Sequence, residues 1–145
     1  MSLRMNFTDS EWETLEKTPV WAFILTAAAD GNVDKKELEA FAKELSETMQ
    51  YKDELAREVF MSLVARLNDI LPSCIDGPEK VIAGLQSAGQ IVDAKCPLNA
   101  EPFKRSVLLI CSNVAEASGK VFGSKVSEEE KTAIVIVASA LGVKM

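Results

Sequence analysis

Three carboxylates stand close together in one short segment of the chain. Asp30, Asp34 and Glu37 belong to the sequence DGNVDKKEL. Their spacing matches the second half of an EF-hand loop, in which oxygen atoms bind Ca²⁺. The first and third loop positions would be Thr26 and Ala28, which carry no carboxylate and stand in an apolar segment. We therefore expect a half-loop with three acidic donors and not a complete EF-hand.

Two interpretations of these acids stay open. Asp34 can cap a helix that starts there, with Glu37 closing the capping box, so that neither acid needs a metal ion. Asp30 fits this interpretation less well, because it follows an apolar helix whose C-terminal dipole disfavours a negative charge by up to ~1 kcal/mol. A nearby cation would offset that cost. An exposed Asp beside Gly is, however, common in turns.

A degenerate second copy of the pattern lies near the other end of the chain. The segment ASGKV at 117–121 resembles ADGNV at 29–33, and acidic residues follow in both copies. If the two segments lie side by side, one hard cation such as Ca²⁺ or Mg²⁺ would have oxygen ligands from both. The second set of acids also suits the first turn of a helix without any ligand. The candidate metal ligands are Asp30, Asp34, Glu37, Glu116, Ser118 and Glu130.

Composition excludes several kinds of chemistry. The chain has no histidine, which removes Ser–His and Cys–His nucleophile pairs and histidine metal ligands. Its three cysteines have no CxxC spacing, so we expect reduced core thiols in a cytoplasmic protein. The formal net charge of −6 argues against binding to nucleic acid. No apolar run reaches the ~18 residues of a membrane span, and no targeting signal is evident.

The pattern of caps and apolar spacing predicts helices throughout. Thr8 with Glu11 forms a capping-box pattern, Thr18-Pro19 is typical of a new helix start, and Val20–Ala29 reads as a buried helix. Later helices are expected to begin near Asp34, Lys52, Asp76, Asn99 and Ser127, with stops near Pro72, Pro97, Gly119 and Gly142. We therefore predict an all-α bundle of about seven helices. It forms a single domain over 1–145, built partly from a duplicated helix–loop–helix, with residues 1–5 disordered or an expression remnant.

The segment AAADGNVDKKELEAF, together with the later AEASGKV and VSEEEKTAI, resembles the tellurite-resistance TerB-like family. The resemblance spans the whole chain in layout and is strongest at 27–41. It implies an all-helical fold with an acidic cluster that binds metal ions, and a link to tellurite or stress response through protein partners. In the second motif Ser118 stands where an Asp is usual, and five residues are inserted at 122–126.

Three functions follow from these observations. The first is a non-enzymatic TerB-like module with a weak divalent-cation site. The second is a protein-interaction scaffold without metal, acting through a protein partner or a homodimer, whose surface would be marked by exposed aromatic residues: Trp12, Trp21, Tyr51 or Phe122. The third is a metal-assisted hydrolase in which Asp30 and Glu37 act on water. No nucleophile or substrate is indicated, so we expect no catalytic residues.

Overall fold

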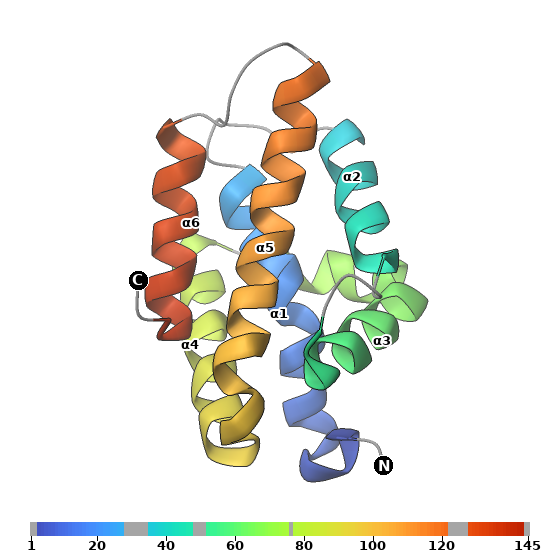
Figure 1. The fold of residues 1–145 in the computed structure, drawn as a ribbon, viewed down its shortest axis with the longest axis vertical. Helices are drawn as coiled ribbons and strands as arrows, with labels where there is room; N and C mark the ends of the chain where they lie inside the picture. Colours follow the sequence, from blue (N-terminus) through green and yellow to red (C-terminus); the bar gives the residue numbers. More distant parts are fainter. Residues whose placement is uncertain (1–2, 28–34, 48–51, 76, 122–127, 144–145) are drawn as a thin grey trace.

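The computed structural model describes residues 3–27, 35–47, 52–75, 77–121 and 128–143, and the side chains of 115–121 and 128–130 lie outside that description. Within these ranges every regular element is helical, which confirms the all-α prediction (Figure 1). The described residues form six α-helices and two short 3-10 helices, close to the predicted seven. Their bounds are η1 Leu3–Asn6, α1 Asp9–Ala27, α2 Lys35–Ser46, α3 Glu54–Ile70, η4 Leu71–Cys74, α4 Pro78–Lys95, α5 Pro97–Val121 and α6 Glu128–Leu141.

Helix α1 is the central element of the bundle. It packs against α3, α4, α5 and α6, and its core residues include Leu15, Val20 and Phe23. Helices α1 and α5 run in the same direction, while α2, α4 and α6 run opposite to them (Figure 1). The duplicated helix–loop–helix of the sequence therefore corresponds to the pairs α1–α2 and α5–α6. Among the described residues, no helix is long and apolar enough to cross a bilayer.

Several predicted helix signals are confirmed. Thr8 N donates to Glu11 Oε1 at 2.8 Å and Glu11 N donates to Thr8 Oγ1 at 3.1 Å, so the capping box is reciprocal. Gly142 ends α6 with a φ of 85°, and the amide of Val143 donates to the carbonyl of Ala138. This left-handed glycine is the predicted C-terminal stop.

The predicted helix start at Thr18-Pro19 is wrong, because α1 continues through Pro19 without a break. Proline lacks the amide that a helix interior normally uses, which favours a break. Here Trp12 and Leu15 before the proline and Phe23 after it all lie in the core. Burying that whole face in one helix outweighs the missing hydrogen bond.

The predicted caps Asp76 and Asn99 also differ from the structure. Asp76 lies outside the described residues, and the N-cap of α4 is Gly77. Helix α5 begins at Pro97, and the Asn99 side chain donates to Asp53 Oδ1 at 2.7 Å. Asp53 itself is the N-cap of α3, which the sequence analysis did not identify. Asn99 therefore joins the starts of two helices and does not cap its own.

Candidate metal centre

Of the six predicted metal ligands, only Glu37 has a described side chain. It lies in the first turn of α2 and is buried, with 6% of its surface exposed. Asp30 and Asp34 lie outside the described residues. The backbone of Glu116 and Ser118 belongs to α5, which continues to Val121 beyond the predicted stop near Gly119. Glu130 lies in the first turn of α6. The ligand set as a whole stays a prediction.

Four helix ends gather at one end of the bundle. Helices α1 and α5 finish there, and α2 and α6 begin there (Figure 1). We call this the acidic end, because the sequence places all six predicted ligands within or between these four helix ends. The opposite end, which holds the starts of α1 and α5 and the finishes of α4 and α6, we call the braced end. The expected gathering of both copies at one end thus agrees with the course of the helices.

The position of Glu37 on α2 directs it toward the bundle interior. Glu37, Phe41 and Leu45 are spaced by four residues and are all buried, so they share one face of the helix. The Phe41 ring stacks on Phe23 of α1 with 4.4 Å between ring centroids. The Glu37 carboxylate therefore lies one helical turn nearer the acidic end than the stacked Phe23–Phe41 pair, on the same buried face of α2.

The contact between α2 and α5 shows which part of α5 lies beside Glu37. Asn113 Nδ2 donates to Glu44 Oε2 at 3.0 Å across this antiparallel pair. Glu37 is seven residues before Glu44, a rise of about 10 Å. The same rise along α5 from Asn113 reaches its last turn. The backbone of Glu116 and Ser118 therefore lies within about one helical turn of the level of Glu37.

The six predicted ligands would supply oxygen donors and no nitrogen or sulfur donors. Carboxylate and hydroxyl oxygens are ligands that Ca²⁺ and Mg²⁺ prefer. Among the residues with described side chains, no three His, Cys, Asp or Glu residues come together to hold a metal. A complete site would thus need donors from the residues around Glu37 whose side chains fall outside the described set.

A second buried carboxylate, which the sequence analysis missed, lies in α1. Glu16 is fully buried, accepts a hydrogen bond from Ser62 Oγ at 2.6 Å, and pairs with Arg66 Nη1 at 2.8 Å. Trp12 Nε1 in turn donates to Ser62 Oγ at 3.2 Å. A signal for it was present, because Glu16 lies four residues after Trp12 and four before the core residue Val20, on the apolar face of the helix.

The braced end carries a buried cation as well. Lys104 of α5 is 2% exposed, and its Nζ contacts Asp93 Oδ1 of α4 at 2.8 Å. Close by, a Cβ on Gly89 would come within 2.4 Å of the Leu141 carbonyl oxygen, so α4 and α6 meet there backbone to backbone. Charge at this end is thus offset within the protein itself.

The three cysteines are buried free thiols, as predicted. Burial raises the pKa of the Cys111 thiol to about 12, and a hydrogen bond with Thr26 opposes that shift. A thiol with such a pKa is not a nucleophile near neutral pH.

The aromatic residues expected to mark a surface do not do so where they are described. Trp12 is buried against Phe7, and Arg4 lies over its ring at 5.3 Å. Trp21 is half-buried and packs closely on Gly84 of α4. Tyr51 and Phe122 lie outside the described residues.

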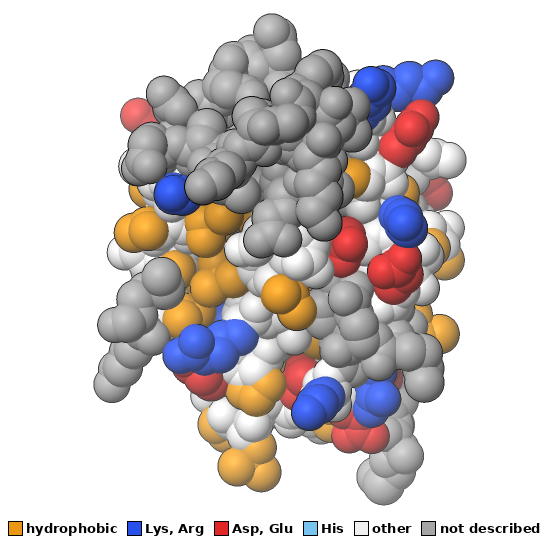
Figure 2. All heavy atoms as spheres, turned by 45° about the horizontal axis from the view of Figure 1, so that its top comes forward, with side chains coloured by type: hydrophobic (Ala, Val, Ile, Leu, Met, Phe, Trp, Pro, Cys, Tyr) orange, Lys and Arg blue, Asp and Glu red, His pale blue; other side chains and the backbone are white. Residues whose placement is uncertain are grey.

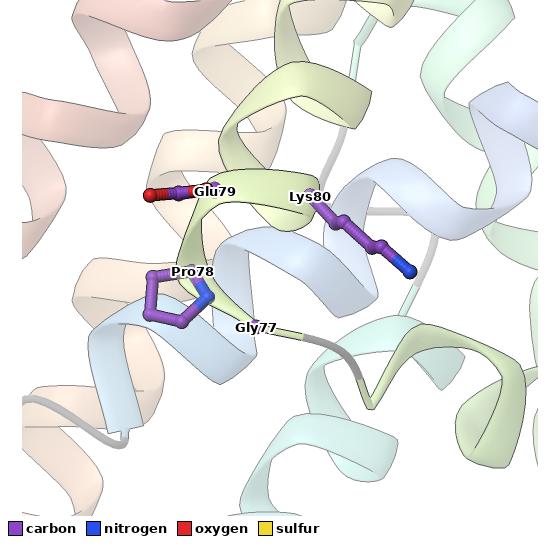
Figure 3. Close-up of a pocket in the computed structure, with 4 residues that line it drawn as sticks. All are labelled: Gly77, Pro78, Glu79 and Lys80. Carbon is purple, nitrogen blue, oxygen red and sulfur yellow. The ribbon is translucent and has the colours of Figure 1, made fainter.

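A hollow of ≈ 430 Å³ lies at the start of α4, and none of its described lining residues is a predicted ligand. Gly77, Pro78, Glu79 and Lys80 line it, and the Glu79 and Lys80 side chains point in opposite directions (Figure 3). Catalysis needs groups that converge on one point, and these diverge. The hydrolase hypothesis, which requires a pocket beside Asp30 and Glu37, gains no support from this hollow.

Most of the chain matches a known protein family. Residues 20–145 match the model of the family described as tellurite resistance protein TerB. The chain belongs to the TerB family. A similar relative, "Uncharacterized protein ORF11'" of Methanothermobacter thermautotrophicus, is 26% identical over 140 residues, covering 94% of this chain and 90% of the relative. No solved structure matches the chain significantly. The match confirms the resemblance seen in the sequence, and it starts within α1.

Proposed function

We propose that this TerB-family chain is a non-enzymatic helical module that binds one divalent cation, Ca²⁺ or Mg²⁺, weakly at its acidic end. The proposed ligands are Asp30, Asp34 and Glu37 from the first helix pair, with Glu116, Ser118 and Glu130 from the second. The proposed role is in tellurite or stress response, exerted through a protein partner. The family description names tellurite resistance and so supports the tellurite part of this role.

The observation that carries the cation proposal is the inward, buried position of Glu37. A buried carboxylate at this position gives a cation an oxygen donor inside the acidic end, and Ca²⁺ and Mg²⁺ prefer such donors. The sequence places the five other predicted ligands within or between the neighbouring helix ends, and carboxylates that lie close together repel one another. A divalent cation would lower the energy of all these groups together.

The site is proposed to be weak because one copy of the motif has lost charge. Ser118 supplies a neutral hydroxyl where Asp30 supplies a carboxylate in the first copy, and Lys120 adds a positive charge beside it. Cation affinity in oxygen sites falls as the number of charged ligands falls. We expect dissociation constants in the range of roughly 10⁻⁴ to 10⁻³ M, typical of low-affinity Ca²⁺ modules.

Calorimetric titration with Ca²⁺ and with Mg²⁺ tests the proposal. The wild type should release or absorb heat with one-site stoichiometry, and Glu37→Gln and Asp30→Ala should each weaken binding at least about tenfold. Glu39→Gln is the matched control, because Glu39 lies on the same helix and is exposed. Binding by Glu39→Gln should equal that of the wild type.

Absence of heat at millimolar metal in the wild type would refute the cation site. Equal weakening in Glu37→Gln and Glu39→Gln would show a diffuse effect of net charge instead of ligation. Circular dichroism of each variant ensures that lost binding reflects the site and not unfolding. Asp30→Ala provides the second variant if Glu37→Gln does not fold.

A further inference from the structure

Helix α6 carries apolar residues on the face turned away from the core. Its buried face holds Ala133, Val137, Ala138 and Leu141. On the other face Val135 is 52% exposed and Ile136 is 43% exposed. Figure 2 shows hydrophobic side chains gathered on the side of the molecule where α6 lies. Apolar side chains of this size left in water mark a contact surface when they adjoin one another.

The exposed face of α6 carries no charged residue, and its polar and apolar residues follow one another in a symmetric order. Thr132, Val135, Ile136 and Ser139 are all exposed and follow one another at helical spacing as polar, apolar, apolar, polar. No Asp, Glu, Lys or Arg occurs between residues 132 and 143. Charged residues make up 26% of the whole chain, so an uncharged exposed helix face departs from the rest of the surface.

We propose that this face binds a second copy of the same chain, with the two α6 helices antiparallel about a two-fold axis between Val135 and Ile136. In that arrangement Val135 of one copy meets Ile136 of the other, and Thr132 meets Ser139. A two-fold interface requires a surface that is complementary to itself. The order of these four residues meets that requirement, since reversing the helix restores the same order of polar and apolar positions.

Charge limits where two copies can meet and favours this direction. Each copy carries a formal net charge of −6, so copies repel one another over most surfaces and an interface between them requires a face without charge. The uncharged face lets two copies meet without removing any charge from water. Exposed Lys131 at the start of the face would lie beside the C-terminal end of the second α6, where the helix dipole attracts a cation.

The size of the face limits the strength of the dimer. One exposed helix stripe of four residues offers only part of the about 800 Å² that each partner buries in a stable interface. The dimer is therefore weak and transient, and it forms as concentration rises. This surface lies on the flank of α6, and the proposal does not depend on the cation site.

Sedimentation equilibrium over a wide concentration range tests the dimer. The wild type should pass from monomer to dimer below about 1 mM, and Val135→Lys and Ile136→Lys should each weaken association at least tenfold. Met61→Lys is the control: Met61 of α3 is 61% exposed, but Arg57 and Glu58 precede it on the same side of its helix. A wild type that stays monomeric, or equal weakening by Val135→Lys and Met61→Lys, would overturn the proposal.

The direction of the helices can be tested by cross-linking. Because the native thiols are all buried, a cysteine introduced at Thr132 or Ser139 is the accessible one. Mixing Thr132→Cys with Ser139→Cys protein under oxidation should give several-fold more disulfide-linked dimer than either variant alone. Equal or greater linkage within each single variant would contradict the antiparallel contact.

Discussion

The two ends of the bundle each hold a buried glutamate, and they stabilise it differently. At Glu16, in the half of α1 nearer the braced end, Ser62 and Arg66 contact the carboxylate directly. At Glu37, at the acidic end, the surrounding sequence supplies more acids, and we propose that a cation completes the group. The contrast teaches that one buried glutamate can be offset by a cation of the chain itself, here the half-exposed Arg66, while the other is proposed to contribute to a ligand site.

The largest expected effect concerns Arg66. Arg66→Ala leaves the buried Glu16 without its cation. Because the Arg66 side chain is itself 49% exposed, the cost lies at or below the lower limit for a fully buried pair, at about 2–3 kcal/mol. Urea denaturation measures the loss. Arg105→Ala serves as control, because its pair with Glu101 is exposed on both sides and should contribute less than about 0.5 kcal/mol. Similar losses in the two variants would show that Glu16 does not depend on Arg66.

A smaller loss is expected where α4 meets α6 at the braced end. Gly89→Ala places a methyl group against the Leu141 carbonyl oxygen, and forced backbone shifts of this kind cost about 1–3 kcal/mol. Thermal unfolding should show a lower Tm. Gln90→Ala, at the exposed position next to Gly89 on the same helix, should change stability by less than about 0.5 kcal/mol. An unchanged Tm in Gly89→Ala would mean that this end is not closely packed.

Cys111, between α1 and α5, should make stability depend on alkaline pH. Its folded pKa of about 12 lies above the ordinary value of 9.0. The thiol therefore contributes its full stability below pH 9, and that contribution falls as the pH rises toward 12. The loss at pH 10 should be roughly 1 kcal/mol. Urea unfolding of the wild type and Cys111→Ala between pH 8 and 10 measures it, and parallel profiles would contradict it.

The smallest expected effect is stabilisation by Ca²⁺, which should depend on Glu37 and not on the pair of Glu16 with Arg66. Ca²⁺ at about three times its dissociation constant should stabilise the folded protein by roughly 0.8 kcal/mol. The same increment should appear in Arg66→Ala, because the two sites are separate. It should vanish in Glu37→Gln. Thermal unfolding with and without Ca²⁺ provides the readout, and a Ca²⁺ increment that persists in Glu37→Gln would remove this residue from the site.

The helical fold could be predicted because it depends on local sequence signals that tertiary packing does not override. Thr8 with Glu11 and Gly142 act within one or two turns of helix, so the sequence alone identifies them. The predictions at Pro19 and Asn99 were wrong, because the roles of these residues depend on contacts with distant residues. Pro19 is kept inside α1 by the core, and Asn99 binds Asp53, which is 46 residues away.

The candidate site was predictable only as a set of acids. The duplicated pattern predicted that both helix pairs meet at one end, but the burial of Glu37, four residues before Phe41, was not predicted. The burial of Glu16 was missed as well, although it lies on the apolar face of α1, and its partners come from α3, beyond the reach of any local pattern. An acid is visible in a sequence, whereas the group that neutralises it is not.

The continuity of α1 through Pro19 has a consequence for how this family's domain can be cut from a longer chain. The match to the TerB family starts at Val20, one residue after that proline. A fragment that began there would divide α1 and discard Trp12 and Leu15, both of which fill the core. The region that matches the family model is thus shorter than the unit that folds, and expression of residues 20–145 alone should yield a destabilised protein.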